Sequence, residues 1–353
     1  MLKVAESYLK GHPDKVCDQV ADAILDEFLR RDRNTKANIE VFAGHGAMMI
    51  SGEVDSLADF DVAAVAKRVY RESGYEDEIE PFVHLGAWRR EWHETLTKGA
   101  ATEQAVCYGY ATKATREMLP PAVVFAHAIA KKIDESRIHN GQMGWLRPDG
   151  RVLLAMDGKF VSHVSVFAQH VKDAKVQEVH NGILTNVIRP SIGPVDNVKL
   201  FVNPAGAFTQ GGLSCRSGQS GRRVASDLYG GLIPQSNGSL SGKDPSHPLR
   251  AGTYMSRHIA KSLVTAGMAK QALVKIVYII GRVDPVIVEA TGDAGADLSD
   301  FVKEHFDLRI ASIVDRFQLR KPIYRDVSVY GHVGRADLPW EEVATFEETE
   351  KQA

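Results

Sequence analysis

The segment from residue 13 to residue 31 has the strongest helical pattern in the chain. Apolar side chains recur at every fourth position along one side of it, with two leucines beside them: Val16, Val20, Ile24, Phe28, Leu25 and Leu29. This spacing predicts an amphipathic helix whose apolar side packs in a core. The other side is charged, and we expect it to face solvent: Asp18, Asp22, Asp26 and Arg30.

The pentapeptide Gly11-His12-Pro13-Asp14-Lys15 opens this helix. The first backbone N–H groups of a helix have no partner within the helix and carry a partial positive charge. His12 and Lys15 at this end therefore predict an anion site, with phosphate as the expected ligand. Asp14 would repel a bare phosphate, and a Mg²⁺ ion between the two would remove that repulsion. The alternative is a well-capped helix in which His12 and Asp14 only bind backbone groups.

The chain has 353 residues, more than one ordinary core accommodates, so two or three domains are expected. Its 25% of charged residues and formal charge of -2 argue against a general nucleic-acid or membrane-surface binder. Cys17, Cys107 and Cys215 form no CxxC pair, so we predict neither a zinc site nor a disulfide framework and expect a reducing cytoplasm. No apolar run approaches the roughly 20 residues of a membrane span, and the N-terminus lacks a hydrophobic signal segment.

Strand and helix patterns alternate along the chain, and a strand pair followed by a long helix is expected in each third. Strands are predicted at 39–54 (a pair broken at Gly44 and Gly46), 151–156, 159–169, 198–202, 272–280 and 286–291. The Asp157-Gly158 turn makes a hairpin of the second and third of these. Helices are predicted at 56–73, 120–137, 176–187 and 253–266. Residues 89–98 are charged and aromatic, and we expect an exposed connection there.

The stretch 211–242 is polar and rich in glycine, and it is too long to be an idle connection in a compact domain. It leads into Gly238-Ser239-Leu240-Ser241-Gly242-Lys243-Asp244, which resembles a Walker loop. Its glycines are one residue too close, and Asp244 stands where Ser or Thr should bind Mg²⁺, so it is not a P-loop. Small residues next to a lysine still suit a polyphosphate. The predicted result is a cationic, metal-supplied cradle made of His12, Lys15, Arg222, Arg223 and Lys243 with Asp14 and Asp244.

Short motifs follow one another along almost the whole chain. They are Gly-His-Pro-Asp-Lys at 11–15, Phe-Val-Asn-Pro at 201–204, Gly-Arg at 221–222, Asp-Leu-Tyr-Gly-Gly at 227–231, Ser-Gly-Lys-Asp-Pro at 241–245, Pro-Ile-Tyr-Arg at 322–325 and Tyr-Gly-His-Val-Gly-Arg at 330–335. In this order they resemble the S-adenosylmethionine synthetases, the methionine adenosyltransferases. The resemblance implies an α+β fold of three similar domains around a pseudo-threefold axis, which we expect at 1–95, 96–206 and 207–353, with the spatial domains interleaved in sequence.

The resemblance also implies dimers, or dimers of dimers, with active sites at the subunit interface. Methionine sulfur would attack C5′ of ATP, and the whole triphosphate would be released and hydrolysed before the products leave. Mg²⁺ and usually K⁺ would be needed. The residues agree with this chemistry, because preorganised cations stabilise the charge that develops on a departing triphosphate, and a sulfur nucleophile needs no general base.

The resemblance assigns roles to individual residues. Those implied as catalytic are His12, Lys15, Arg222 and Lys243. Those implied to contact ATP are His12, Asp149, Arg151, Phe208, Arg216, Arg222, Arg223 and Lys243. Methionine, or another small nucleophile, is expected next to Glu53, Arg216 and His247. Asp14 matches a Mg²⁺ ligand, and Glu40 matches the K⁺ carboxylate.

The departures from the family pattern gather on the methionine side. Glu103 replaces an aspartate in the loop at 100–105, and His247 replaces a lysine. Leu249 replaces the second metal carboxylate. Arg216 stands where an aspartate shared by ATP and methionine is expected, and by pairing with Glu40 it would take the place of the K⁺ ion. The gating loop of the family is missing, and the region 85–98 is shorter than usual.

Three functions fit this pattern. The one we favour is a methionine adenosyltransferase with compensating changes. The second is transfer of adenosyl to another nucleophile, or cleavage of polyphosphate alone. The third is an inactive subunit that binds ATP or a partner. Identifying every product formed from ATP and Mg²⁺, with and without methionine, would separate the three.

Overall fold

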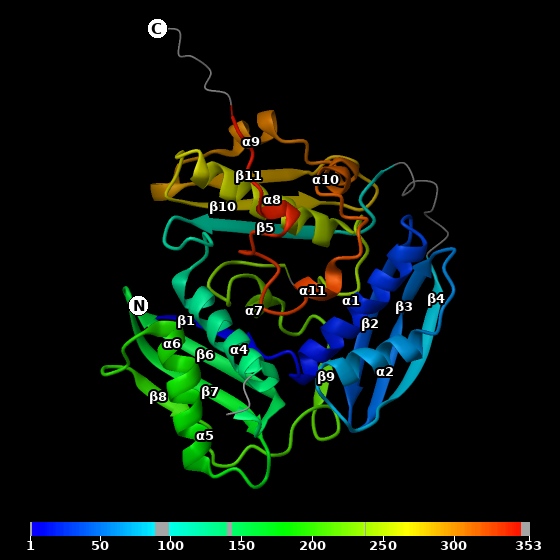
Figure 1. Cartoon of the computed structure of the whole chain (residues 1–353). Coiled ribbons are helices and arrows are strands. Elements are labelled where there is room, and N and C mark those ends of the chain that lie inside the picture. The colour runs from blue at the N-terminus through cyan, green and yellow to red at the C-terminus, as the bar shows by residue number, and fades with distance from the viewer. Residues whose placement is uncertain (1, 89–98, 140–142, 237, 347–353) are drawn as a thin grey trace.

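The computed structural model describes residues 2–88, 99–139, 143–236 and 238–346, so the connection expected at 89–98 lies outside the described residues. Three sheets surround a shared centre, with helices packed against them (Figure 1). This arrangement confirms the predicted α+β class. Within these ranges no helix is both long and apolar enough to cross a bilayer.

The first sheet has the strand order β1-β6-β7-β8. Its strands are β1 Lys3–Tyr8, β6 Leu146–Asp157, β7 Phe160–His170 and β8 Lys199–Val202. β6 and β7 form the predicted hairpin, and Gly158 in its turn has a φ of +57°. Three helices accompany this sheet at the lower left of Figure 1: α4 Pro121–His139, α5 Val176–Ile183 and α6 Arg189–Ile192.

The second sheet has the order β4-β3-β2-β9 and is covered by α1 Pro13–Arg31 and α2 Val62–Glu72. Its strands are β2 Lys36–Gly44, β3 Ala47–Asp55, β4 Glu80–Ala87 and β9 Ser217–Gln219. α2 begins at Val62 and not at residue 56, so the predicted start is wrong. The cause is Asp61, whose side chain accepts the N–H of Ala64, while Asp32 binds the N–H of Leu57 and holds the preceding residues in a turn.

The third sheet has the order β11-β10-β5 and packs against α8 Pro248–Thr265. Its strands are β5 Ala105–Thr112, β10 Gln271–Tyr278 and β11 Ile287–Thr291, and α9 Ser299–His305 and α10 Ile310–Arg316 lie near them. α8 begins earlier than the predicted residue 253, because His247 caps it by accepting the N–H of Leu249. Gly109 allows β5 to approach α8, since a Cβ there would lie 1.9 Å from the carbonyl carbon of Ser256.

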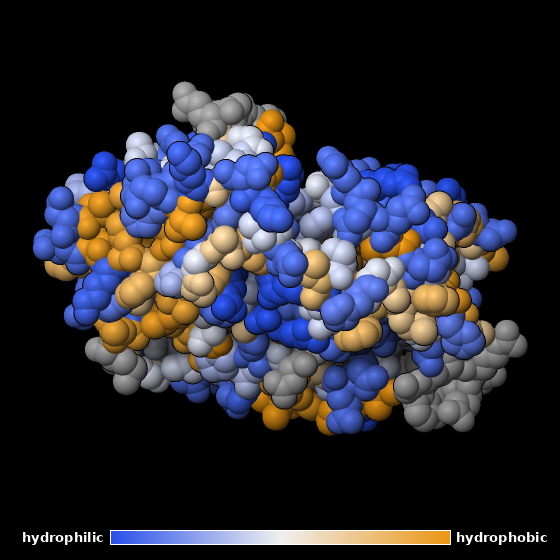
Figure 2. All heavy atoms as spheres, turned by 90° about the horizontal axis from the view of Figure 1, so that it is seen from below, coloured by the Kyte–Doolittle hydropathy of each residue, from blue (hydrophilic) through white to orange (hydrophobic). Residues whose placement is uncertain are grey.

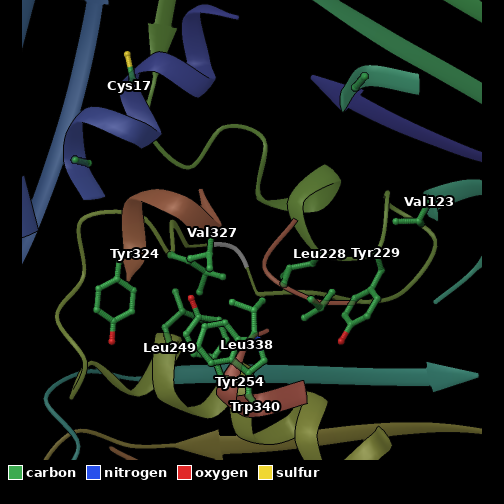
Figure 3. Packing of buried hydrophobic residues seen from close by; sticks show 14 of the residues in the cluster. Cys17, Val123, Leu228, Tyr229, Leu249, Tyr254, Tyr324, Val327, Leu338 and Trp340 are labelled. Carbon is green, nitrogen blue, oxygen red and sulfur yellow. The ribbon is translucent and has the colours of Figure 1, made fainter. Parts of the chain in front are cut away.

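Two short helices, α7 Val224–Leu228 and α11 Tyr324–Val327, lie between the three sheets (Figure 1). Beside them, Tyr254 of α8 stacks on Trp340 with ring centroids 3.7 Å apart (Figure 3). The Trp340 indole donates to the carbonyl of His332 at 2.7 Å, and the His332 ring contacts the Tyr254 hydroxyl at 3.0 Å. These contacts fix residues 332–340 against α8.

The predicted apolar side of α1 is buried, but the prediction that its charged side faces solvent is wrong. Arg30 is exposed, whereas Asp18, Asp22 and Asp26 are 1%, 0% and 3% exposed. Residues 219–242 and α11, which are distant in sequence, cover this side of the helix. Buried carboxylates need donors inside the protein, and these segments provide them.

Candidate active site

His12 precedes α1 and caps it. Its Nδ1 accepts the N–H of Asp14 at 3.2 Å, so the ring hydrogen is on Nε2. His12 is 2% exposed, and its Nε2 has no hydrogen-bond partner among the described residues. Burial, followed by the charges of Arg216 and Arg223, lowers the pKa of His12 well below its ordinary value of 6.5. A neutral imidazole with one free N–H therefore stands at the start of the helix.

Two arginines converge on Asp14, which is 1% exposed. Arg222 Nη1 lies 3.0 Å from one carboxylate oxygen, and Arg223 Nε lies 2.6 Å from the other. The backbone N–H of Gln219 donates to the carboxylate as well, at 3.0 Å. Arg223 also donates to the hydroxyl of Tyr8 at 2.9 Å and lies over its ring. Two permanent cations around one carboxylate leave an excess of positive charge here.

Arg216 contacts Asp149 at the start of β6. Its Nη1 lies 2.9 Å from Asp149 Oδ2, and the N–H of Gly212 donates to the same oxygen at 3.0 Å. The predicted pair between Arg216 and Glu40 is therefore wrong. The backbone N–H of Arg216 binds the carbonyl of Gly212, and this turn directs the guanidinium toward Asp149. Burial raises the pKa of Asp149, and Arg216 acts against that rise.

A second group of polar side chains lies along β2. Lys243 Nζ is 3.2 Å from Asn38 Oδ1 and 3.3 Å from Glu40 Oε1. The Ser220 hydroxyl donates to the other oxygen of Glu40 at 3.1 Å. Alternate residues of β2 are buried beneath α1, so Asn38 and Glu40 point away from that helix. Lys243 thus supplies the positive charge next to Glu40.

A pocket of about 450 Å³ adjoins Lys243 and includes Asn38, Glu103, His247 and Leu249 in its wall. His247 is 4% exposed, and burial together with Lys243 lowers its pKa well below 6.5, so its ring is neutral. The pocket brings together three of the positions at which the chain departs from the pattern it resembles: Glu103, His247 and Leu249.

β9 joins the two groups. The N–H of Gln219 binds Asp14, and the hydroxyl of the next residue, Ser220, binds Glu40. Gly218 allows β9 to lie against the start of α1, because a Cβ there would be 2.2 Å from the carbonyl oxygen of Pro13. The group at the helix start and the group along β2 are therefore connected through consecutive residues.

Lys15 is buried, and it pairs with other carboxylates than Arg222, Arg223 and Lys243 do. Its ammonium is 2.8 Å from Asp18 Oδ2 and 2.5 Å from Asp227 Oδ2, and the residue is 1% exposed. Burial alone would lower the pKa of Lys15, but the two carboxylates outweigh it and raise the pKa. In this conformation the ammonium is paired with two carboxylates of the protein. Its contact with phosphate stays a prediction.

Two further predicted residues lie near these groups, and a third lies in the segment after β8. Glu53 stands opposite Asn38 in the pairing of β2 with β3. Arg151 of β6 lies close enough to His12 to help lower its pKa. Phe208 is half-buried in the segment after β8. No three His, Cys, Asp or Glu side chains of the described ranges are grouped so as to hold a metal ion.

Three family models match consecutive parts of the chain. The N-terminal domain of S-adenosylmethionine synthetase matches residues 1–85, the central domain matches 98–208, and the C-terminal domain matches 210–342. The chain belongs to the S-adenosylmethionine synthetase family. The resemblance drawn from the motifs is thereby confirmed, and so is the family's three-domain α+β fold.

Relatives in this family align over nearly the whole chain. The S-adenosylmethionine synthase of Aquifex aeolicus is 36% identical over 377 residues, which cover 98% of each chain. That of Staphylococcus epidermidis is 34% identical over 381 residues, covering 97% of this chain and 95% of the relative. That of Synechococcus sp. (strain CC9311) is 35% identical over 402 residues, covering 99% and 96%.

Several contacts of this candidate site are not predicted by the sequence. Tyr8 lies beside Arg223, and Asn38 lies beside Lys243. Both occupy ordinary strand positions, so no local pattern marks them. The spacing of Asp18 on α1 predicts an exposed residue, but Asp18 is buried.

Proposed function

We propose that this synthetase-family chain is a methionine adenosyltransferase. The sulfur of methionine attacks C5′ of ATP, S-adenosylmethionine forms, and the released triphosphate is hydrolysed. The names of the relatives support this reaction. The structural observation that carries the proposal is the convergence of Arg222 and Arg223 on Asp14, beside the free N–H of a neutral His12.

The chemistry of the leaving group explains why such a site is needed. Breaking the bond from C5′ to oxygen leaves both bonding electrons on the triphosphate, whose negative charge grows toward the transition state. Arg222 and Arg223 are already held in place near the helix start, so they stabilise this charge with little reorganisation. His12 Nε2 donates a further hydrogen bond to a phosphate oxygen. The attacking sulfur carries no proton, so no general base is needed, and the lowered pKa of His12 and His247 makes both rings weak bases.

The donor set fits Mg²⁺ held mainly by substrate. Asp14 offers a single carboxylate at the helix start, and Arg222 and Arg223 are paired with its two oxygens, so Mg²⁺ would take most of its ligands from phosphate oxygens and water. Bound there, Mg²⁺ would neutralise phosphate charge. Glu40 is the carboxylate proposed for K⁺, and Lys243 already balances its charge. We therefore infer that activity depends weakly on K⁺.

We infer further that the chain forms a homodimer, or a dimer of such dimers, with the site at the interface. Phe42, Met49 and Phe82 are paired across β2, β3 and β4, and they are 53%, 48% and 55% exposed. Phe42 lies on the same side of β2 as Glu40. A second copy covering this exposed apolar row would therefore also cover the Lys243 group.

The deciding experiment supplies the purified chain with ATP, Mg²⁺ and methionine and identifies all products by mass spectrometry. We expect S-adenosylmethionine with orthophosphate and pyrophosphate, and no adenosyl product when methionine is left out. Phosphate release without an adenosyl product would mean a polyphosphatase. No consumption of ATP under any condition would mean a binding subunit.

A further inference from the structure

Four buried aspartates stand at every fourth position of α1, and each accepts a backbone N–H from a distant segment. The aspartates are Asp14, Asp18, Asp22 and Asp26. Their donors, in the same order, are Gln219 at 3.0 Å, Gly221 at 2.7 Å, Gly242 at 2.9 Å, and Tyr324 with Arg325 at 3.0 and 2.9 Å. We call this row the aspartate ladder.

The ladder follows from helix geometry. Residues four apart lie on nearly the same side of a helix and are about 6 Å apart along its axis. Burying a carboxylate destabilises the folded state unless donors surround it. Each aspartate of the ladder is therefore stabilised by the segment that donates to it. The rigid helix thereby sets the spacing between loops that are far apart in sequence.

Asp18 binds Gly221, the residue directly before Arg222. Its Oδ1 accepts the N–H of Gly221, and its Oδ2 accepts from Lys15, which is also held by Asp227. Gly221 has a φ of +77°, and a Cβ there would lie 2.3 Å from the side chain of Ser239. The peptide that leads into Arg222 is therefore confined on both sides.

The Asp22 rung holds the peptide on both sides of Lys243. Its Oδ1 accepts the N–H of Gly242 and also Arg250 Nη2, at 2.9 and 2.6 Å. Arg250 Nε in turn donates to the carbonyl of Lys243 at 2.7 Å. Asp22 and Arg250 are both 0% exposed, so this clamp is shielded from water.

We propose that Asp18 and Asp22 are positioning residues of the active site, which place Arg222 and Lys243 at a fixed distance from His12 and Asp14. This proposal rests on the function proposed above. The Asp26 rung binds α11, which contains none of the predicted site residues, so Asp26 provides a matched control on the same side of the same helix.

The test compares Asp18→Ala with Asp26→Ala in the full-length chain with ATP, Mg²⁺ and methionine. Both variants lose a buried acceptor of backbone N–H groups, so both should melt at a lower temperature. In Asp18→Ala the ammonium of Lys15 keeps Asp227 as a partner. We expect kcat to fall about 10- to 100-fold in Asp18→Ala and to stay within about twofold in Asp26→Ala, because small misplacements of catalytic groups have effects of that size. Equal kcat in the two variants would overturn the proposal.

A conservative variant separates positioning from folding. Asp18→Asn keeps an oxygen that can accept the N–H of Gly221, so it should recover most of the turnover lost in Asp18→Ala. At the second rung, Asp22→Asn and Lys243→Ala should not be additive, and the double variant should be no slower than the slower single variant. Fully additive losses, or no recovery in Asp18→Asn, would count against positioning.

Binding of Mg²⁺-tripolyphosphate keeps this test independent of the overall reaction. If the chain makes no S-adenosylmethionine, the proposed function fails, but calorimetry with tripolyphosphate still reports on the cations. The ladder predicts at least a tenfold weaker affinity in Asp18→Ala and an unchanged affinity in Asp26→Ala. Equal affinities in the two variants would refute the ladder whatever the enzyme makes.

Discussion

At the residue scale, Arg216 ties the loop before β9 to the start of β6. In Arg216→Ala the buried Asp149 carboxylate keeps the N–H of Gly212 but loses a charged donor, which is worth on the order of 1.5 to 3 kcal/mol. We expect KM for ATP to rise about tenfold with a smaller change in kcat. The response to K⁺ should not change, because Arg216 does not contact Glu40 in the structure.

Steady-state kinetics in K⁺ and in tetramethylammonium will check this prediction, with Arg147→Ala as an exposed control two residues before Asp149. If Arg216→Ala gained activation by K⁺, Arg216 would act at Glu40 after all.

His258 of α8 is a second residue whose environment has a measurable consequence. It is 2% exposed, donates to the carbonyl of Glu342, and has Phe306 and Phe317 against its ring. Burial, and then the charge of Arg316, lowers its pKa to about 4. The unfolded chain has the ordinary value of 6.5, so it takes up a proton first as the pH falls. His258 therefore makes folding less stable as the pH drops from about 6.5 to about 4.

The variant His258→Asn keeps a donor for the Glu342 carbonyl and cannot titrate. Urea unfolding at pH 7.5 and pH 5 should show a smaller loss of stability in this variant than in the natural chain, by about 1.4 kcal/mol for each unit of pKa difference that the pH interval covers. An identical pH dependence in both proteins would show that folding does not lower the pKa of His258.

At the scale of elements, α1 shows what the sequence can and cannot predict. Its period and its cap were readable, because both depend on neighbours three or four residues away. The burial of Asp18 and Asp22 was not readable, because the donors lie some two hundred positions further along the chain. β4 was missed for a related reason. It pairs in parallel with β3 and exposes much of its length, so it lacks the apolar alternation of a half-buried strand.

The candidate site divides in the same way. Motif residues such as His12 and Lys243 were found because their spacing is local, and the structure brings their groups together through β9. The partner of Arg216 depends on a tertiary turn, so the sequence pattern favours Glu40 whereas the guanidinium contacts Asp149 in the structure.

The contact between α1 and α11 has its own pH dependence. Asp26 binds the N–H groups of Tyr324 and Arg325, and burial raises its pKa from 3.8 to about 7. Between about pH 4 and pH 7 the unfolded chain gives up this proton and the folded chain keeps it, so this group's contribution to stability falls as the pH rises. The side chain in Asp26→Asn cannot ionise. The free energy of unfolding of this variant, relative to that of the natural chain, should therefore increase from pH 5 to pH 8. A difference that stays constant with pH would mean that Asp26 is ionised in the fold.

At the scale of the whole molecule, hydrophobic side chains gather in patches on the surface, separated by hydrophilic ones (Figure 2). Phe42, Met49 and Phe82 form one exposed row, and Val106 and Ile287 flank Val277 in a similar row on the third sheet. Rows of this kind on two sheets favour association with a second copy.

Phe42→Glu places a charge in the first row and should convert the proposed dimer to monomers with loss of activity. Sedimentation equilibrium will measure the mass, and Leu57→Glu, at a residue that is 96% exposed outside any strand, should leave it unchanged. A natural chain that sediments as a monomer at all concentrations would remove the proposed interface.

The strand order has a consequence for the growing polypeptide. β1 pairs with β6, β2 pairs with β9, and β5 pairs with β10, so each sheet joins segments that are more than a hundred residues apart. During synthesis β5 emerges long before its partner at Gln271–Tyr278, and the backbone edge that pairs with this partner stays open on the ribosome until then. A chain stopped before that partner is made presents an open strand edge to its neighbours, which is a known route to aggregation. Holding chaperones should therefore bind nascent chains of intermediate length most strongly and release them once the third sheet closes.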